Sequence, residues 1–249
     1  MKRDINTALV LCAALASHFS SAGEPVSLSP KRTETMLTKQ EHPLTAQQKN
    51  MAGIAAQAAT GNMSGLNNAL QHGLDAGLTV SDCREILVQL YAYAGFPRSL
   101  NALSELMNVI KARRAQGIQD AEGRLPGPMP KPDEMLAVGT QNQTALVGKP
   151  VEGPLFGFAP AADEYLKTHL FGDIFSRDNL DWKSRELATV GALAAMPGVE
   201  QQLKAHLSMS MNVGITQPQL AELVPFFEEK GEKVIANRLR AALDSVRAD

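Results

Sequence analysis

The chain has 249 residues, of which 44% are hydrophobic and 20% are charged, and its formal net charge is -2. This length and apolar content suffice for the core of one large domain or two small ones, and they exclude a disordered or fibrous chain. The sequence has no run of five or more basic residues. We therefore expect no nucleic-acid surface, because neutralising phosphates requires clustered Lys and Arg.

The amino terminus has the pattern of a secretory signal peptide. Lys2 and Arg3 precede an apolar run at 8–16, and small residues follow at Ser20 and Ala22. The apolar run is too short to span a bilayer, and cleavage is expected near Ala22. A short amphipathic helix is the alternative interpretation. The pattern predicts a signal peptide at 1–22, a polar lead at 23–43, and a periplasmic or secreted protein that has no membrane contact after cleavage.

Apolar residues recur at helical spacing through residues 44–115 and again through 160–247, and no convincing run of alternating strands appears. We therefore predict an all-α fold with a first helical repeat at 44–116 and a second at 160–249. Residues 117–159 are rich in Pro and Gly, which are incompatible with a long helix. They are predicted to be a linker.

The two helical units are diverged copies of one pattern. Residues 66–90 align with residues 203–227. The alignment pairs a glycine, a threonine and a glutamate of each copy: Gly77 with Gly214, Thr79 with Thr216, and Glu85 with Glu222. In each copy, this pattern predicts a helix that stops at the glycine and a following helix that is capped by the threonine. The unit is an αα-hairpin used twice.

The helix expected at 81–94 carries a narrow polar strip. Glu85, Gln89 and Tyr93 recur at i, i+4 and i+8, so they lie on one side of the helix. The strip either lines a cavity or is a solvated or buried hydrogen-bonded stripe. Tyr91 lies on the apolar face, where a tyrosine more often belongs to a core than to a site.

Gly95-Phe96-Pro97 is expected to end this helix and to turn Arg98 toward whatever lies at the helix end. The guanidinium of Arg98 has the donor fork that binds a substrate carboxylate. It could equally bind the last carbonyls of the helix.

In the second copy, His206 lies at the edge of an apolar stripe marked by Leu203, Leu207 and Met211. A partly buried imidazole can transfer a proton near neutral pH, although such a histidine is often structural. Glu186 on the preceding helix is the candidate that orients or charges it. The alternative for Glu186 is an ordinary solvated helix start.

Other chemistries find little support in the sequence. It has no H-x-x-x-H or C-x-x-C pair, no phosphate-binding glycine loop and no Gly-x-Ser-x-Gly elbow, so we expect no metal and no cofactor. After signal cleavage Cys83 is the one remaining cysteine, which excludes an intrachain disulfide. Its neighbours Val80, Ile86 and Leu87 predict a buried, inert thiol.

Residues 169–216 resemble the 4-carboxymuconolactone decarboxylase family, including Gly172-Asp173-Ile174 and the Leu-Lys-x-His segment that ends at His206. Residues 85–103, EILVQLYAYAGFPRSLNAL, resemble the segment that normally follows in the same family domain. The resemblance implies two tandem all-α repeats that form an intrachain pseudo-dimer. It also implies cofactor-free chemistry and a homo-oligomer, for which a trimer is the natural expectation.

Each copy keeps a different half of the family pattern, so we expect one composite site per chain. The hypothesis is a carboxy-lyase that decarboxylates a small carboxylated lactone or a related acid. Arg98 would hold a carboxylate, His206 would protonate the carbon left by carbon dioxide, and Glu186 or Glu85 would set the charge of the imidazole. The expected site residues are catalytic His206, Glu186 and Glu85, with Arg98, Tyr91, Tyr93 and Gln89 binding the substrate.

Two alternatives remain open. Glu186 and His206 also match the outer residues of the alkyl hydroperoxidase D-like motif of the same peroxiredoxin-like superfamily. The cysteine positions of that motif fall on Val199 and Gln202, so the dithiol is absent and peroxide reduction by that mechanism is excluded. The other alternative is a non-catalytic small-molecule-binding or assembly protein on the same fold.

Overall fold

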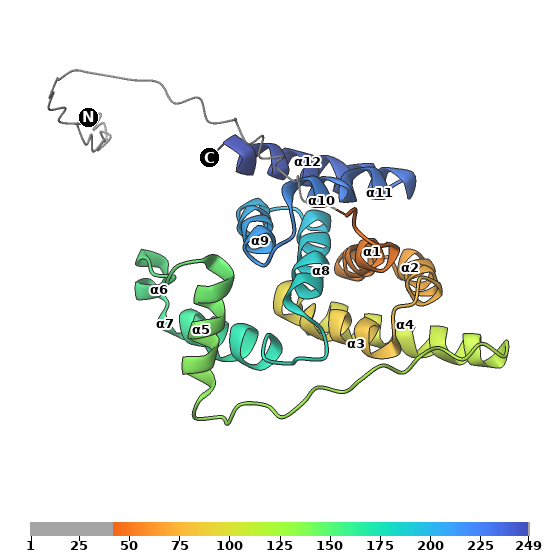
Figure 1. Ribbon diagram of the computed structural model, residues 1–249, viewed down its shortest axis with the longest axis horizontal. Helices are drawn as coiled ribbons and strands as arrows, with labels where there is room; N and C mark the ends of the chain where they lie inside the picture. Colours follow the sequence, from red (N-terminus) through yellow and green to blue (C-terminus); the bar gives the residue numbers. More distant parts are fainter. Residues whose placement is uncertain (1–41, 249) are drawn as a thin grey trace, which may run out of the picture. The chain divides into compact units, whose positions relative to one another are not determined.

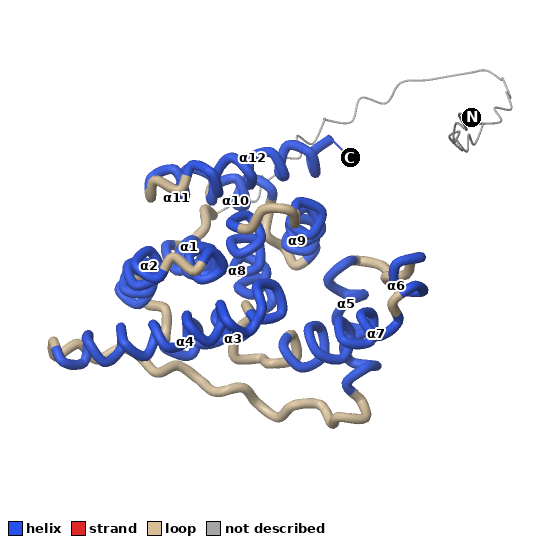
Figure 2. The backbone as a smooth tube through the Cα atoms, turned by 180° about the vertical axis from the view of Figure 1, so that it is seen from behind, coloured by secondary structure: helices blue, strands red, loops and turns tan. Residues whose placement is uncertain are grey.

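The computed structural model describes residues 42–248, and every regular element within this range is a helix (Figures 1 and 2). The all-α prediction is confirmed, and the predicted signal peptide lies outside the described residues. None of the described helices combines the length and apolarity needed to cross a membrane.

The core forms where α1 (Ala46–Thr60), from the first repeat, packs against α8 (Trp182–Ala195), from the second. Both helices are rich in small residues, and this lets their backbones approach closely. At Gly191, an added Cβ would lie 2.7 Å from the carbonyl carbon of Ala52. Buried residues of both repeats belong to one hydrophobic cluster. The two repeats therefore share a core, as a tandem pseudo-dimer requires.

The repeated αα-hairpin is present in both copies. In the first, α2 (Met63–Asp75) ends before Gly77 and α3 (Val80–Gln89) begins after the capping residue Thr79. In the second, α9 (Glu200–Asn212) ends before Gly214 and α10 (Gln217–Ala221) begins after Thr216. Both glycines adopt positive φ, at 94° and 89°, and both threonines form a complete capping box. The predicted helix ends at the glycines and helix caps at the threonines are confirmed in both copies.

The predicted break after residue 94 occurs inside α4 (Tyr91–Ala115). Gly95 has φ 80° and ψ 160°, a conformation that strains any residue with a Cβ, and the helix resumes through Pro97. One boundary differs from the prediction, because α3 already ends at Gln89 and Leu90 separates it from α4. The polar strip therefore extends across two helices.

The segment between the repeats is more ordered than its composition predicts. A helix of 13 residues, α5 (Met135–Val147), forms within the predicted linker because this stretch contains no proline. It packs against η1 (Leu166–Ile174), a π-helix in which Phe175 N donates to Leu170 O at 3.1 Å. The prediction was a Pro- and Gly-rich linker that cannot form one long helix, and it did not include this helix of 13 residues.

Short helices α6 (Pro154–Phe158) and α7 (Pro160–Tyr165) lead into η1, and α11 (Leu223–Glu229) follows α10. The last helix, α12 (Lys233–Ala248), packs on α11, α9 and α8 (Figure 1). It thereby covers the carboxyl end of α8, where Arg238 donates to the oxygen of Ala195, and the starts of α4 and α8 lie at the opposite end of α8 (Figure 1).

Candidate active site

Glu186 and His206 form a buried pair between α8 and α9. Asp181 caps α8 and places Glu186 in its second turn, where the side chain is fully buried. Its Oε2 lies 2.8 Å from His206 Nδ1, and the His206 side chain is 8% exposed. The structure therefore brings together the two residues that the sequence predicted as acid–base partners.

Tyr93 completes this pair from the first turn of α4. Its ring meets the His206 ring edge-on, with the centroids 5.4 Å apart. The Tyr93 hydroxyl and Glu186 Oε1 are buried, and neither makes a hydrogen bond among the described residues. Burial raises the pKa of the Tyr93 phenol, and the Glu186 carboxylate raises it further. Two buried polar atoms without partners mark a spot that a polar group of a ligand would satisfy.

The rest of the polar strip is tied to α8. Gln89 Nε2 donates to the backbone oxygen of Arg185 at 2.9 Å and to the Thr189 hydroxyl at 3.0 Å. Arg185 is fully buried, and its guanidinium contacts Glu85 at 3.2 Å. At Glu85 and Gln89 the strip is thus a buried hydrogen-bonded stripe, one of the two alternatives that the sequence left open, whereas the Tyr93 hydroxyl makes no such bond.

Glu85 is shared by two arginines. Arg177 donates to both of its carboxylate oxygens, at 2.8 and 2.6 Å, and Arg185 adds the third contact. Burial alone would raise the pKa of Glu85, but the hydrogen bonds and charges of the arginines outweigh it and lower the pKa to about 2. No hydrogen bond or ion pair joins Glu85 to His206 among the described residues. The carboxylate that contacts the imidazole is that of Glu186.

The other two predicted ligand-binding residues lie elsewhere. Tyr91 stacks on Phe96 with the ring centroids 4.3 Å apart, and its other neighbour is His169 at 5.4 Å. Arg98 is exposed, and its guanidinium lies against Gly61, the residue that caps the end of α1. A cation at this helix end is stabilised by the partial negative charge of the last carbonyls. The structure does not bring Arg98 together with the Glu186–His206 pair.

Sequence reasoning missed two groups. Arg177 and Arg185 lie 92 and 100 positions from the carboxylate they bind, so no local pattern indicates them. His169 and Asp173 form a second histidine–carboxylate pair, with Nδ1 and Oδ2 2.6 Å apart. Their i, i+4 spacing was the available signal, since residues at this spacing share a helix face.

The described part of the chain contains neither a cluster of residues suited to a metal ion nor an accessible thiol. No cluster of three or more His, Cys, Asp or Glu side chains suited to a metal ion occurs there. Cys83 is buried, and burial raises the pKa of its thiol to about 12, with the nearby Asp82 and Asp120 adding to the effect. The thiol is therefore un-ionised at neutral pH and unreactive, as predicted.

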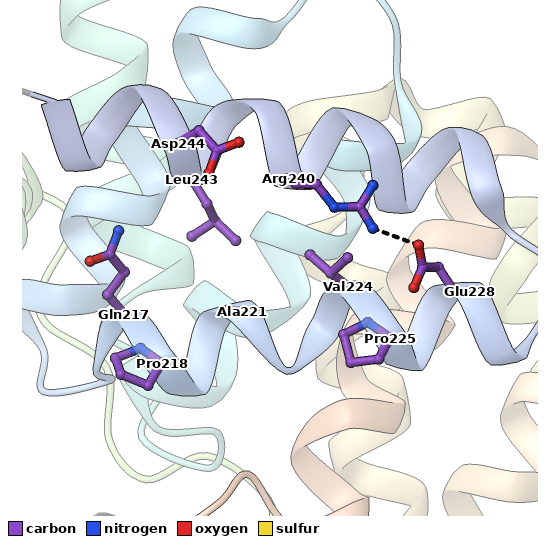
Figure 3. A pocket seen from close by; sticks show the side chains of 9 residues that line it. All are labelled: Gln217, Pro218, Ala221, Val224, Pro225, Glu228, Arg240, Leu243 and Asp244. Carbon is purple, nitrogen blue, oxygen red and sulfur yellow. Dashed lines mark hydrogen bonds and ion pairs between the residues drawn. The ribbon is translucent and has the colours of Figure 1, made fainter.

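A groove of about 510 Å³ lies between α10–α11 and α12 (Figure 3). Its walls include Val224 and Leu243, and Arg240 and Glu228 face each other across it at 2.5 Å. It contains none of the predicted site residues, so the candidate active site remains the Glu186–His206–Tyr93 group.

The amino-acid sequence matches a known family. The model of the carboxymuconolactone decarboxylase family matches residues 30–106 and 160–225, more than half of the chain and part of each repeat. The 4-carboxymuconolactone decarboxylase of Acinetobacter baylyi (strain ATCC 33305 / BD413 / ADP1) is 33% identical over 60 residues. This match covers 24% of the chain and 44% of that protein.

Proposed function

This chain belongs to the carboxymuconolactone decarboxylase family, and from that premise we propose that it is a cofactor-independent carboxy-lyase for a small carboxylated lactone or a related acid. The observation that carries the proposal is the Glu186–His206 contact of 2.8 Å beside two buried polar atoms without partners. A buried carboxylate held against an imidazole is suited to proton transfer at neutral pH.

The geometry of the pair gives Glu186 and His206 different roles. Nδ1 of His206 faces Glu186, so Nε2 is the nitrogen left to deliver a proton. Glu186 is fully buried whereas 8% of the His206 side chain remains exposed, so the ring is the member that a small molecule reaches. Glu186 fixes the orientation of the imidazole through its contact with Nδ1.

The proposed reaction is a decarboxylation followed by one proton transfer. The carbon–carbon bond to the carboxylate breaks, carbon dioxide leaves, and the bonding pair stays on the substrate carbon, where conjugation with the unsaturated lactone spreads it. The imidazolium of His206 then donates its proton to that carbon, and solvent restores the proton to His206. Buried apolar surroundings favour a neutral leaving group over the carboxylate.

Carbon dioxide release from carboxymuconolactone and related acids tests the proposal. We expect His206→Ala to abolish release, because it removes the proton donor, and Glu186→Gln to reduce it about 100-fold or more, within the range that general acid catalysis contributes. Tyr93→Phe should lower release with little change in the urea unfolding free energy, because the hydroxyl it deletes makes no hydrogen bond of normal geometry and has only Thr189 nearby.

His72→Ala, at an exposed histidine on α2, is the matched control and should retain full activity. Release that survives His206→Ala in a folded protein would contradict the mechanism. A wild-type protein that binds these acids but releases no carbon dioxide would favour the non-catalytic binding protein instead.

A further inference from the structure

A second site opens on the surface beside the start of α4. It is a cleft of about 630 Å³, within the range of small-molecule pockets, and residues from α3, α4, η1 and the segment before α5 line it. The His169–Asp173 pair lies in it, with each side chain about half exposed (48% and 47%). The buried Glu186–His206 pair does not line this cleft.

The cleft presents an arginine that its own partners do not neutralise. Arg177 and Arg185 share the single carboxylate of Glu85, so these three side chains keep one net positive charge, and the other carboxylate of the cleft, Asp173, is engaged by His169. Arg177 is the member that reaches the cleft, where 29% of its side chain is exposed. Its Nε and Nη2 are used by Glu85, whereas Nη1 makes no hydrogen bond among the described residues. A free, oriented guanidinium donor of this kind is suited to a carboxylate oxygen.

His169 supplies a second polar contact. Asp173 accepts from Nδ1 and thereby fixes the ring, so in the imidazolium form Nε2–H is left to donate to a ligand oxygen. The Tyr91 ring lies beside the imidazole, with the centroids 5.4 Å apart. Met135 and Ile174 contribute apolar surface to the same cleft. The walls therefore suit a ligand that has one charged group and an apolar or unsaturated body.

One turn of α4 contributes a tyrosine to the cleft and another to the buried pair. Tyr91 contacts His169 in the cleft, and Tyr93, two residues later, contacts His206. Both tyrosines pack against the same hydrophobic cluster, which α5 and η1 form. The charged group that reaches both regions is the arginine–glutamate network, because Glu85 binds Arg177 at the cleft and Arg185 in the interior.

From this geometry we propose that the cleft binds the carboxylate of a small organic acid, with Arg177 holding the carboxylate and His169 a second oxygen. The proposal does not require the proposed function, because His206, the proton donor of the proposed lyase, does not line this cleft. Arg177 takes the role that the sequence assigned to Arg98.

Direct binding tests the cleft without requiring turnover. Isothermal titration of the full chain with benzoate and with muconate, against benzamide as the uncharged probe, measures the need for a carboxylate. We expect wild-type protein to bind both acids. Benzamide should bind at least about tenfold more weakly than benzoate, because it lacks the charge-assisted contact. Arg177→Lys keeps the positive charge opposite Glu85 and therefore the fold, but it removes the two-donor guanidinium. It should weaken the binding of benzoate about tenfold. His169→Gln should weaken it several-fold.

Two arginine variants serve as comparisons. Arg84→Gln removes an exposed arginine paired with Glu122 outside the cleft and should leave benzoate binding unchanged. Arg98→Gln should also leave it unchanged. If Arg98→Gln weakens binding and Arg177→Lys does not, or if wild-type protein binds neither acid, the assignment of the cleft is wrong.

A proton NMR titration of the histidine Cε1–H signals gives a local readout. The His169 signal, assigned by its loss in His169→Gln, should move on addition of benzoate, and an unmoved signal at saturation would overturn the proposal. Failure of the lyase hypothesis is separable: acid binding that depends on Arg177 without carbon dioxide release keeps the cleft and rejects the lyase. Carbon dioxide release that is insensitive to Arg177→Lys and His169→Gln keeps the lyase and separates its substrate site from the cleft, and the binding measurements alone then decide the cleft.

Discussion

At the scale of single residues, Glu85 is a buried charge that two arginines hold. Its side chain is 2% exposed and it neutralises part of two arginines, one of them fully buried. Removing one partner of such a buried ionic group leaves uncompensated charge and typically costs about 3–5 kcal/mol. Glu85 therefore acts on stability, and through Arg177 and Arg185 it holds the polar strip against α8.

The lowered pKa of Glu85 predicts how the free energy of unfolding changes at low pH. It is lowered to about 2 from an ordinary 4.5, because the arginines outweigh the effect of burial, so its ionised form stabilises the fold above pH 4.5 and this stabilisation is lost as pH falls through 2. The difference corresponds to about 3 kcal/mol. We expect the gap in urea unfolding free energy between wild type and Glu85→Gln to shrink by about that amount between pH 5.5 and pH 2.

The matched control is Glu122→Gln, which removes an exposed carboxylate that pairs with Arg84 at the surface. Its gap from wild type should stay small at both pH values, because exposed ion pairs contribute little. A Glu85→Gln gap that is the same at pH 5.5 and pH 2 would show that Glu85 is not held ionised by its arginines.

What the sequence could predict at this scale follows from the range of the interactions. Helical spacing places Glu85, Gln89 and Tyr93 on one side because that geometry is local, and the structure confirms it. The position of Arg98 depends on Gly61 at the end of another helix, and the partners of Glu85 come from the second repeat. These contacts join distant parts of the chain, so no spacing in one sequence reveals them.

At the scale of helices, the capping signals predicted the hairpins correctly because glycine at positive φ and a threonine cap are themselves local chemistry. Composition was a poorer guide. The average Pro and Gly content of residues 117–159 did not indicate α5, because α5 lies in a proline-free stretch between Pro132 and Pro150. The packing of α1 on α8 also has no local signature apart from the small residues of both helices.

That packing predicts the effect of Gly191→Ala. The new methyl group would meet backbone atoms of Ala52, which cannot move aside as a side-chain end can, so α1 and α8 must separate. Overpacking costs about 1–3 kcal/mol, and alanine regains up to about 1 kcal/mol of helix propensity. We expect a net loss of about 1–2 kcal/mol in the urea unfolding free energy.

Gly157→Ala is the comparison, because Gly157 also lies in a helix but a Cβ there would meet nothing within 4 Å. It should leave the unfolding free energy unchanged or slightly raised. If Gly191→Ala is as stable as wild type, the two helices do not approach as closely as the structure describes.

At the scale of the whole molecule, the sequence anticipated that two decayed copies act as one unit, and the shared core of α1 and α8 agrees with this. The copies are complementary at the candidate site too, because α4 of the first supplies Tyr93 while α8 and α9 of the second supply Glu186 and His206. Neither copy alone contains the arrangement. This is why the site could be expected only after the repeat had been found.

The described surface also supports a prediction about assembly. Phe96, Leu100 and Met107 lie on one face of α4, spaced at i, i+4 and i+11, and are 59%, 57% and 71% exposed. A stripe of large apolar side chains on one exposed helix face is typical of an interaction surface. We propose that it packs against another copy of the chain, as the family resemblance implies, because burying three such side chains per copy stabilises an isologous or cyclic contact.

The test is the molar mass in solution by light scattering. Wild-type protein should be oligomeric, and Leu100→Glu with Met107→Glu should shift it toward the monomer, because each carboxylate would have to be buried unpaired at the contact. Val234→Glu, at a 63% exposed valine on α12, introduces the same group away from the stripe and should leave the mass unchanged. Because Tyr91 stacks on Phe96, the stripe adjoins the cleft that contains His169. A monomeric wild type, or a double variant with unchanged mass, would assign the stripe no role in assembly and leave the cleft open to solvent in every copy.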